Sequence, residues 1–173
     1  DANWPFAFDS SQVFRLSDDT LDLTLSVTNQ SPAAAPFGLG WHPYFVKRER
    51  SRLSFQATGR WEMGDDKLPT HRSPSRGIDA DCAFLDVDHC FDGVRGDVHL
   101  RDERMHVRVR SDLSHLVVFT NNARSDIAIE PVSHVNNALA LTERADAAQH
   151  GWTAQSLGLR VLQPGESLSV TMS

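Results

Sequence analysis

Hydrophobic and polar residues alternate along much of the chain with a period of two, which is typical of strands buried on one face. Residues 20–28 give the clearest case, because apolar side chains occupy every second position there. The alternating apolar residues are Leu21, Leu23, Leu25 and Val27; Leu53, Phe55 and Ala57; Met105, Val107 and Val109; Leu157, Leu159 and Val161; and Leu168, Val170 and Met172. The pattern predicts antiparallel strands that pack against a shared core.

Two further segments, His115–Thr120 and Ile127–Ile129, are more continuously apolar. A strand has this composition when both of its faces are buried, so we expect both segments to be central strands. Pro164 and Gly165 separate the last two alternating runs. Because these residues are a turn signal, the runs on either side should pair as a hairpin.

The chain offers few signals for helices. The best helical segment covers residues 137–149, which are rich in Ala and Leu, with Gly151 placed to cap its end. Residues 65–81 are polar and contain Pro69, Pro74 and Gly77, which predicts a long surface loop of the kind that often borders a binding cleft. Many short strands and little helix predict an all-β fold, an antiparallel β-sandwich or barrel, in a single domain over residues 1–173.

Composition and charge narrow the classes of function. The formal net charge is −6 and the basic residues are scattered, which argues against nucleic acid and anionic membrane as partners. No apolar run approaches the ~20 residues that span a bilayer, and no signal peptide opens the chain. The two cysteines, Cys82 and Cys90, are too few for a disulfide scaffold. Together these features favour a cytoplasmic protein.

Several motifs of cofactor and nucleophile chemistry are missing from the sequence. It has no Gly-x-x-x-x-Gly-Lys phosphate loop, no Gly-x-Gly-x-x-Gly fingerprint and no Gly-x-Ser-x-Gly elbow. The histidines include no pair spaced to bind a metal on one helix. We therefore expect neither a metal nor an organic cofactor.

The segment Phe37–Phe45 joins two glycines, a proline and His42 to large aromatic residues, among them Trp41 and Tyr44. Aromatic faces suit the C–H faces of a sugar ring, and histidine suits proton transfer near neutral pH. The alternative is that the aromatic residues belong to the core and that His42 is an interior histidine held by hydrogen bonds. Composition alone leaves both interpretations open.

A second segment ends in a carboxylate, because Glu130 follows the apolar run Ile127–Ile129. Desolvation there would raise the pKa of Glu130 toward the strength that a base needs. Pro131 should end the strand and fix the local backbone. The alternative is that Glu130 is simply the first exposed residue after a buried strand. Three further acids, which could hydrogen-bond sugar hydroxyls or form an ordinary acidic loop, are Asp86, Asp88 and Asp92.

Taken together, these segments resemble the aldose 1-epimerase (galactose mutarotase-like) family. The resemblance rests on Trp4-Pro5-Phe6, Asn29, Gly38-Leu39-Gly40-Trp41-His42-Pro43-Tyr44-Phe45, Trp61, Leu68-Pro69-Thr70, Asp88-His89-Cys90-Phe91, and Glu130-Pro131-Val132-Ser133-His134 with Asn137-Ala138. These motifs occur in the family's order and span most of the chain. They imply a β-supersandwich, here a partial one, because nothing matches a further N-terminal portion in which family members carry another active-site histidine and a sugar-binding arginine.

The resemblance implies an enzyme that interconverts the α and β anomers of a free hexose. It gives His42 the role of general acid and Glu130 that of general base. We expect these two side chains to face one cleft, far enough apart to admit a pyranose ring and without direct contact. The substrate-binding residues expected beside them are Asp88, Trp41, Tyr44 and Trp61.

Two other functions stay open. A sugar-phosphate (hexose 6-phosphate) mutarotase would need convergent basic residues in the cleft, and the local candidates are Arg72, Arg76 and the cluster Lys47–Arg50. A non-catalytic carbohydrate-binding domain would need neither His42 nor Glu130. Because an N-terminal portion is missing, we also expect an exposed sheet edge through which copies of the chain associate as a homo-oligomer.

Overall fold

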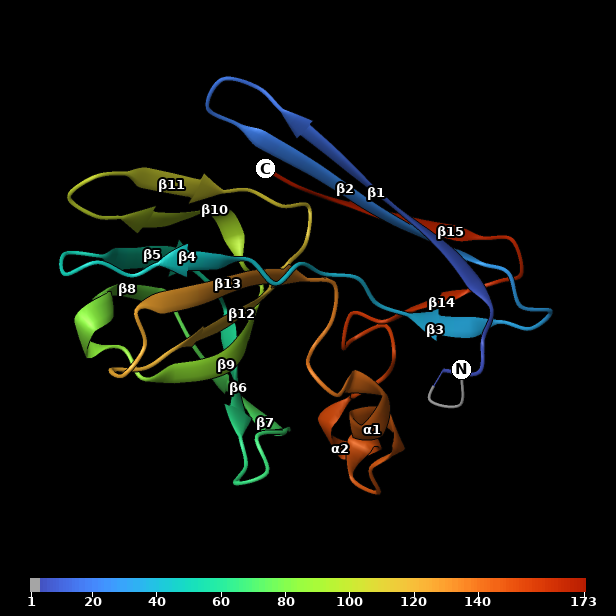
Figure 1. The fold of residues 1–173 in the computed structure, drawn as a ribbon. Helices are drawn as coiled ribbons and strands as arrows, with labels where there is room; N and C mark the ends of the chain where they lie inside the picture. The colour runs from blue at the N-terminus through green and yellow to red at the C-terminus, as the bar shows by residue number, and fades with distance from the viewer. Residues whose placement is uncertain (1–3) are drawn as a thin grey trace.

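The computed structural model of the chain describes residues 4–173, which form antiparallel strands and three short helical segments (Figure 1). The strands are β1 Phe8–Leu16, β2 Leu21–Asn29, β3 Ala35–Phe37, β4 Tyr44–Val46, β5 Arg52–Gln56, β6 Gly59–Met63, β7 Pro69–Pro74, β8 Ile78–Asp81, β9 Val87–Asp92, β10 Arg95–Arg101, β11 His106–Val109, β12 His115–Thr120, β13 Asp126–Val132, β14 Arg160–Leu162 and β15 Ser167–Met172. The helical segments are a 3₁₀ turn at Cys82–Phe84, α1 at Ala138–Glu143 and α2 at Ala147–His150. The predicted all-β class is confirmed.

Two sheets form a sandwich. One is six-stranded, in the order β4-β13-β12-β9-β6-β7, and the other is four-stranded, in the order β11-β10-β5-β8. In Figure 1, β10 and β11 of the four-stranded sheet lie above β12, β9 and β6 of the six-stranded sheet. Both contribute buried residues to the main core, including Leu53, Phe55, Val98 and Leu100 from one sheet and Phe91, Leu116, Val118, Ile127 and Ile129 from the other. The predicted antiparallel β-sandwich and the central places of β12 and β13 are confirmed.

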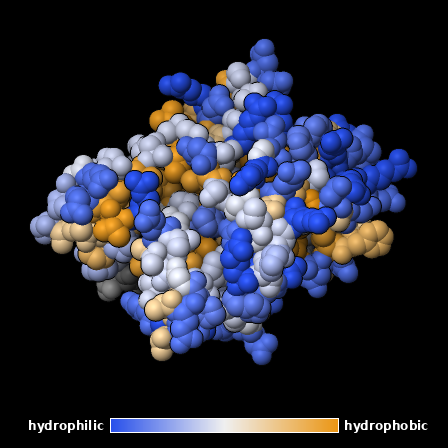
Figure 2. Space-filling view, turned by 180° about the vertical axis from the view of Figure 1, so that it is seen from behind, coloured by the Kyte–Doolittle hydropathy of each residue, from blue (hydrophilic) through white to orange (hydrophobic). Residues whose placement is uncertain are grey.

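Strands β1, β2 and β15 form a separate three-stranded sheet beside the sandwich (Figure 1). In β2, Leu23, Leu25 and Val27 are buried and the residues between them are half-buried, which confirms the predicted alternation except at Leu21, which is exposed. Within residues 4–173, β1 pairs with β2 alone, and every residue of β1 is exposed. Strand β1 is therefore a free sheet edge of the kind expected from the sequence. Figure 2 shows hydrophobic patches exposed on a mostly hydrophilic surface.

The predicted hairpin between the last two alternating runs is wrong. Pro164 and Gly165 do form a turn, but β14 pairs with β3 and β15 pairs with β2. Leu157 and Leu159 lie before β14 and are buried without being in a strand. The buried Asn29 explains the separation, because its side-chain amide donates to the Leu162 carbonyl and its own carbonyl accepts from the Gly165 amide. The chain therefore turns around Asn29 from one sheet to the other.

The predicted loop over residues 65–81 is also wrong, because this stretch contains β7 and β8. Its two prolines, Pro69 and Pro74, are the first and last residues of β7, which is an edge strand. A proline is tolerated there because the edge and the strand ends do not need every N–H. The turn before β8 contains Gly77, with a φ of 91°. Proline and glycine thus mark the ends of strands here.

The predicted helix over residues 137–149 is divided into α1 and α2. It breaks at Arg144, whose backbone is extended. Gly151 caps α2 as predicted, with a φ of 67° and an N–H that donates to carbonyls of α2. None of the helices in residues 4–173 is long and apolar enough to cross a membrane. Both helices pack over a second core cluster that includes Trp61, Val117 and Trp152, on the face of the six-stranded sheet away from the main core.

Candidate active site

The segment that carries His42 runs antiparallel to β13 and continues the pairing of β4. Two observed pairs fix its register, Tyr44 with Ala128 at one end and Gly40 with Val132 at the other. The same register between them places His42 opposite Glu130. Residues directly opposite each other on neighbouring strands point to the same face, with Cβ atoms about 5 Å apart. The backbone pairing therefore brings the imidazole and the carboxylate together.

Pro131 does not end the strand as predicted, because β13 continues to Val132. The amide of Ile129 donates to the Pro43 carbonyl, so position 129 turns its N–H away from β12. Position 131, two residues on, faces the same side, and the Trp41 amide donates to the Pro131 carbonyl there. The missing N–H of Pro131 therefore falls beside the irregular segment before β4 and does not interrupt the pairing with β12.

The two glycines before His42 let its segment lie close to the end of β13. A Cβ on Gly40 would lie 2.7 Å from Val132 Cγ1 and 3.0 Å from the Pro131 carbonyl oxygen. A Cβ on Gly38 would lie 2.3 Å from the His134 ring. The contact at Gly40 involves backbone, which cannot move aside as a side chain can. The Gly-Leu-Gly sequence thus positions His42 through close packing.

The candidate acid and base are in direct contact, with 3.1 Å between His42 Nε2 and Glu130 Oε1. The expectation of a ring-sized gap between them is therefore wrong, and the shared register is the reason. The side chain of Glu130 is 11% exposed and that of His42 is 55% exposed. Burial raises the pKa of Glu130; the charge of His42 opposes this rise and the charge of Asp88 adds to it. The result is a buried carboxyl of raised pKa beside an imidazole open to solvent.

Two of the predicted substrate-binding residues lie next to this pair. The Tyr44 ring packs against the His42 ring with 4.8 Å between centroids, and Tyr44 is exposed. Asp88 on β9 is opposite Phe119 of β12, which in turn is opposite Ala128 of β13. This row lies on the same face as Glu130, two positions along the strand. Tyr44 and Asp88 therefore share a sheet face with His42 and Glu130.

The two predicted tryptophans are not beside the pair. Trp41 is partly buried against the main core, on the other side of its segment from His42. Trp61 is buried under α1 and α2, with its ring 5.7 Å from that of Trp152. It shares a face with Glu130 but belongs to β6, three strands away in the sheet order. Of the three predicted aromatic residues, Tyr44 is thus the one beside His42.

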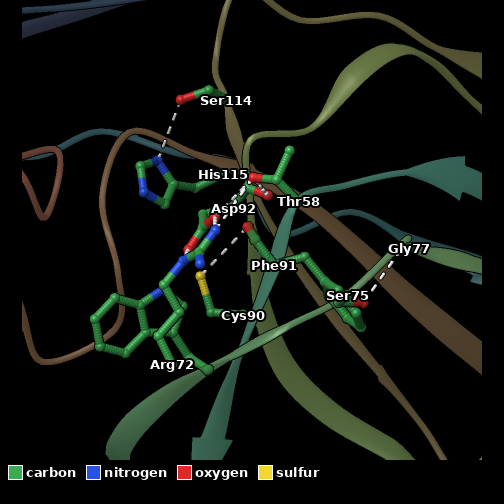
Figure 3. Close-up of polar contacts among 10 residues, drawn as sticks. Thr58, Arg72, Ser75, Gly77, Cys90, Phe91, Asp92, Ser114 and His115 are labelled. Atoms are coloured by element: carbon green, nitrogen blue, oxygen red, sulfur yellow. Dashed lines mark hydrogen bonds and ion pairs between the residues drawn. The ribbon is translucent and has the colours of Figure 1, made fainter.

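Asp92, the alternative to Asp88, is fully occupied by other side chains (Figure 3). Its carboxylate accepts two hydrogen bonds of 2.7 Å from Arg72 and one of 2.9 Å from the Trp61 indole. Burial by itself would raise the pKa of Asp92, but the hydrogen bonds and charge of Arg72, with help from Trp61, hold it below the usual value. The neighbouring His115 is buried, which lowers its pKa and favours the neutral ring. This cluster supports the sheet, whereas Asp88 is the acid whose charge acts on Glu130.

Sequence reasoning missed two residues at the site, Phe119 and Arg124. Phe119 is hidden in the apolar run of β12, and Arg124 lies in the turn between β12 and β13. The Arg124 guanidinium carbon lies 4.9 Å from the Phe119 ring centroid and 5.5 Å from that of Tyr44. No local pattern marks Arg124, because only the pairing of β4 with β13 brings Tyr44 to it. Among residues 4–173, no group of three or more His, Cys, Asp or Glu side chains is arranged to hold a metal.

Comparison with known proteins agrees with this architecture. A crystal structure from Escherichia coli K12, of a protein provisionally described as an aldose 1-epimerase, is 26% identical with a TM-score of 0.80, covering 96% of this chain and 59% of that one. A galactose mutarotase-like protein from Clostridium acetobutylicum has a TM-score of 0.81 at 19% identity, covering 97% of this chain and 55% of that one. At that identity the likeness concerns the fold.

One stretch of the sequence has a closer match. Over 51 residues the chain is 55% identical to the uncharacterized protein YphB of Escherichia coli (strain K12), which covers 30% of this chain and 18% of that protein. The chain thus spans less than two thirds of the length of each of these relatives. The family model for aldose 1-epimerase matches residues 1–173. On this match and on its fold, the chain belongs to the aldose 1-epimerase family.

Proposed function

We propose that the protein is an aldose 1-epimerase that interconverts the α and β anomers of a free hexose, with Glu130 as general base and His42 as general acid. The observation that carries this proposal is the contact of 3.1 Å between a buried carboxylate and an exposed imidazole. The relatives are longer than this chain, so the activity is proposed for the complete encoded protein.

The reaction needs one proton removed and one supplied. Glu130 takes the proton of the anomeric hydroxyl, O1, as the C1–O1 double bond forms and the bond from C1 to the ring oxygen, O5, breaks. His42 gives its proton to O5, which leaves as a hydroxyl. Rotation about the C1–C2 bond presents the other face of the aldehyde, and the ring closes by the reverse transfers. The two side chains then return to their starting protonation states, and no net proton is consumed.

The short distance between the two groups suits this chemistry. O1 and O5 are bonded to the same carbon, so an acid and a base in contact with each other can reach both oxygens of one hemiacetal. A general base must lie within hydrogen-bond reach of the proton that it removes. The close pair therefore supports a transfer from one side of the anomeric centre, in place of the ring-sized gap expected from the sequence.

The environment of Glu130 also supports its role as the base. A carboxyl whose pKa is raised by burial holds a proton more strongly than an exposed one, which brings its basicity closer to neutral pH. Acid/base catalysis by positioned side chains contributes typically ~10²–10⁴-fold. Asp88, on the same face, adds a hydrogen-bond acceptor for sugar hydroxyls.

The sugar-phosphate alternative is less well supported by the contacts of the basic residues. Arg72 is bound to Asp92 on β9, and Arg48 is bound to Asp102 at 2.5 Å. Lys47 donates to the carbonyl of Asn121. Strand β7, which carries Arg72, is at the opposite edge of the six-stranded sheet from β4. Arg72 and Arg48 are thus already paired with aspartates, and Arg72 lies far from the edge that carries His42.

A panel of sugars tests the proposal on the complete encoded protein. Freshly dissolved α-glucose, α-galactose and their 6-phosphates are followed by polarimetry with and without protein. We expect faster equilibration of at least one free aldose and a weaker effect on its 6-phosphate. A stronger effect on the phosphate would favour the alternative substrate. Sugar binding without any change in the rate would favour a binding domain.

A further inference from the structure

We infer that Arg124 binds the sugar hydroxyls farthest from the anomeric carbon and makes the site selective for an uncharged aldose. The inference rests on the proposed function and adds a specificity-determining residue to it. It comes from three properties of Arg124, which are its fixed position, its free donors and the charges around it.

The Arg124 side chain is held in place by its neighbours. Its Nε donates to Asp126 Oδ1 at 2.5 Å, and its guanidinium lies over the rings of Tyr44 and Phe119. These two rings flank Ala128 on the sheet, because Tyr44 and Phe119 are the residues opposite Ala128 on either side. The guanidinium contacts both rings at cation–π distances. Arg124 is thus pre-positioned.

The terminal amino groups of Arg124 are available to a ligand. Within residues 4–173, only Nε and the backbone amide of Arg124 donate hydrogen bonds, to Asp126 and to the Asn121 carbonyl. The side chain is 34% exposed, so the terminal groups reach solvent. An arginine whose guanidinium is already held in place, with its terminal N–H groups free, loses little further entropy when it binds a ligand. These donors are therefore available to oxygen atoms of a ligand.

The position of Arg124 fits one end of a sugar. Tyr44 links it to the acid/base pair, since the Tyr44 ring contacts His42 at 4.8 Å between centroids and Arg124 at 5.5 Å from centroid to carbon. A sugar with its anomeric carbon at His42 and Glu130 would lie across the row Tyr44–Ala128–Phe119. Its far hydroxyls would then meet Arg124.

The charges around Arg124 favour hydroxyls over a phosphate. Its own charge is matched by Asp126, with which it forms an ion pair. The same sheet face carries Glu130 and Asp88, and the charge of Asp88 is close enough to affect the pKa of Glu130. A phosphate would add negative charge beside these two acids, and the charge of Arg124 is already matched by Asp126. A hydroxyl adds no charge and accepts a hydrogen bond from the guanidinium.

The test compares Arg124→Met with Arg110→Met in the complete protein. Methionine keeps an apolar chain over the rings but has no donor, and Arg110 is a matched control because its Nε also binds an aspartate, Asp97, on the other sheet. A hydrogen bond from a charged donor is worth enough to predict a rise in KM of roughly tenfold for Arg124→Met, with the loss mainly in KM rather than kcat. Arg110→Met should keep both constants. Thermal unfolding checks that each variant is folded, and Arg124→Lys provides a second variant that keeps the charge.

Deoxy sugars show whether the effect is direct. Removing the hydroxyl that Arg124 binds should raise KM in the unmodified protein but not further in Arg124→Met. The inference would be overturned if every deoxy sugar raised KM equally, or if KM were unchanged in Arg124→Met. Tighter binding of glucose 6-phosphate than of glucose would also overturn it. Saturation-transfer NMR measures binding of the same sugars, and so separates the role of Arg124 in binding from the proposed mutarotase activity. If no aldose is anomerised, the proposed function fails, whereas the assignment of Arg124 fails only if Arg124→Met binds the free aldose as tightly as the unmodified protein.

Discussion

His42 and Glu130 face each other across a continuous antiparallel register, and their side chains meet at 3.1 Å. The pairing of β4 with β13 continues through an irregular segment to the bridge at Gly40. The geometry of the proposed acid/base pair is therefore a property of the backbone and does not depend on a flexible loop.

The packing of Gly40 gives the first prediction. Gly40→Ala would place a Cβ against the Pro131 carbonyl and the Val132 side chain, so the segment that carries His42 must move away from β13. A displacement of this kind at a catalytic group lowers kcat by roughly 10²-fold. The control is Gly151→Ala, which is strained by a φ of 67° but lies after α2. It should lose about 1 kcal/mol of stability and keep its kcat. Equal activity in the two variants would contradict the role of Gly40.

The ion pair of Asp92 gives the second prediction. Asp92→Asn removes a carboxylate that holds Arg72 and Trp61, and should lower the free energy of unfolding by about 2 kcal/mol. The pKa of Asp92 is lowered in the folded chain, so its contribution is present above its ordinary value of 3.8 and is lost as the pH falls below it. The difference from the unmodified protein should therefore shrink in acid. Asp97→Asn, on a more exposed arginine pair, should change stability by less than about 1 kcal/mol. Urea unfolding at several pH values measures both.

The burial of Glu130 gives the third prediction, an increase in stability when its carboxyl group is removed. The pKa of Glu130 is raised in the folded chain, so its stabilising contribution is full below its ordinary value of 4.5 and is lost as the pH rises through the raised value. Glu130→Gln avoids this loss and should be more stable by roughly 1 kcal/mol at pH 7, as is common when an active-site group is replaced. The gain should vanish below pH 4.5. A variant that is less stable than the unmodified protein at pH 7 would show that the carboxylate stabilises the fold instead.

The free edge of β1 gives the fourth prediction. We propose that the 173-residue chain self-associates by pairing β1 with β1 of a second copy. Antiparallel pairing centred on Gln12 places Asp9 opposite Arg15 of the other copy, and Phe8 opposite Leu16. Opposite charges and apolar side chains are then paired across the two strands. Such an edge of unpaired backbone groups is a template for a further strand.

Sedimentation velocity measures this association. Arg15→Asp should weaken it by placing like charges opposite each other, and the double exchange with Asp9→Arg should restore it. A strictly monomeric chain at high concentration, or association that ignores both substitutions, would rule out this pairing.

The sequence was most informative where local pattern decides structure. The alternation in β2 and the apolar runs of β12 and β13 predict strands, because the burial of each face is recorded in the residues themselves. The motifs around His42 and Glu130 predict the acid/base pair, because the two segments resemble those of the family. In these cases the information lies within a few consecutive residues.

Features that depend on distant pairing could not be predicted in the same way. The turn at Pro164 and Gly165 indicates a change of direction but not that β2 would be the partner of β15. The close contact of His42 with Glu130 follows from the register of an irregular segment, which no local pattern specifies. Arg124 lies in a polar turn, and only tertiary packing places it over Tyr44 and Phe119.

The rate of anomerisation by Glu130→Gln in the complete protein is the most direct test of the central claim, that Glu130 and His42 are the base and acid of a mutarotase. The amide keeps the shape of the carboxyl and loses its basicity, so sugar binding should persist while kcat falls by roughly 10²–10⁴-fold. Polarimetry on freshly dissolved α-glucose or α-galactose follows the rate, and NMR titration with the same sugar follows binding. A variant that equilibrates the anomers as fast as the unmodified enzyme would contradict the account.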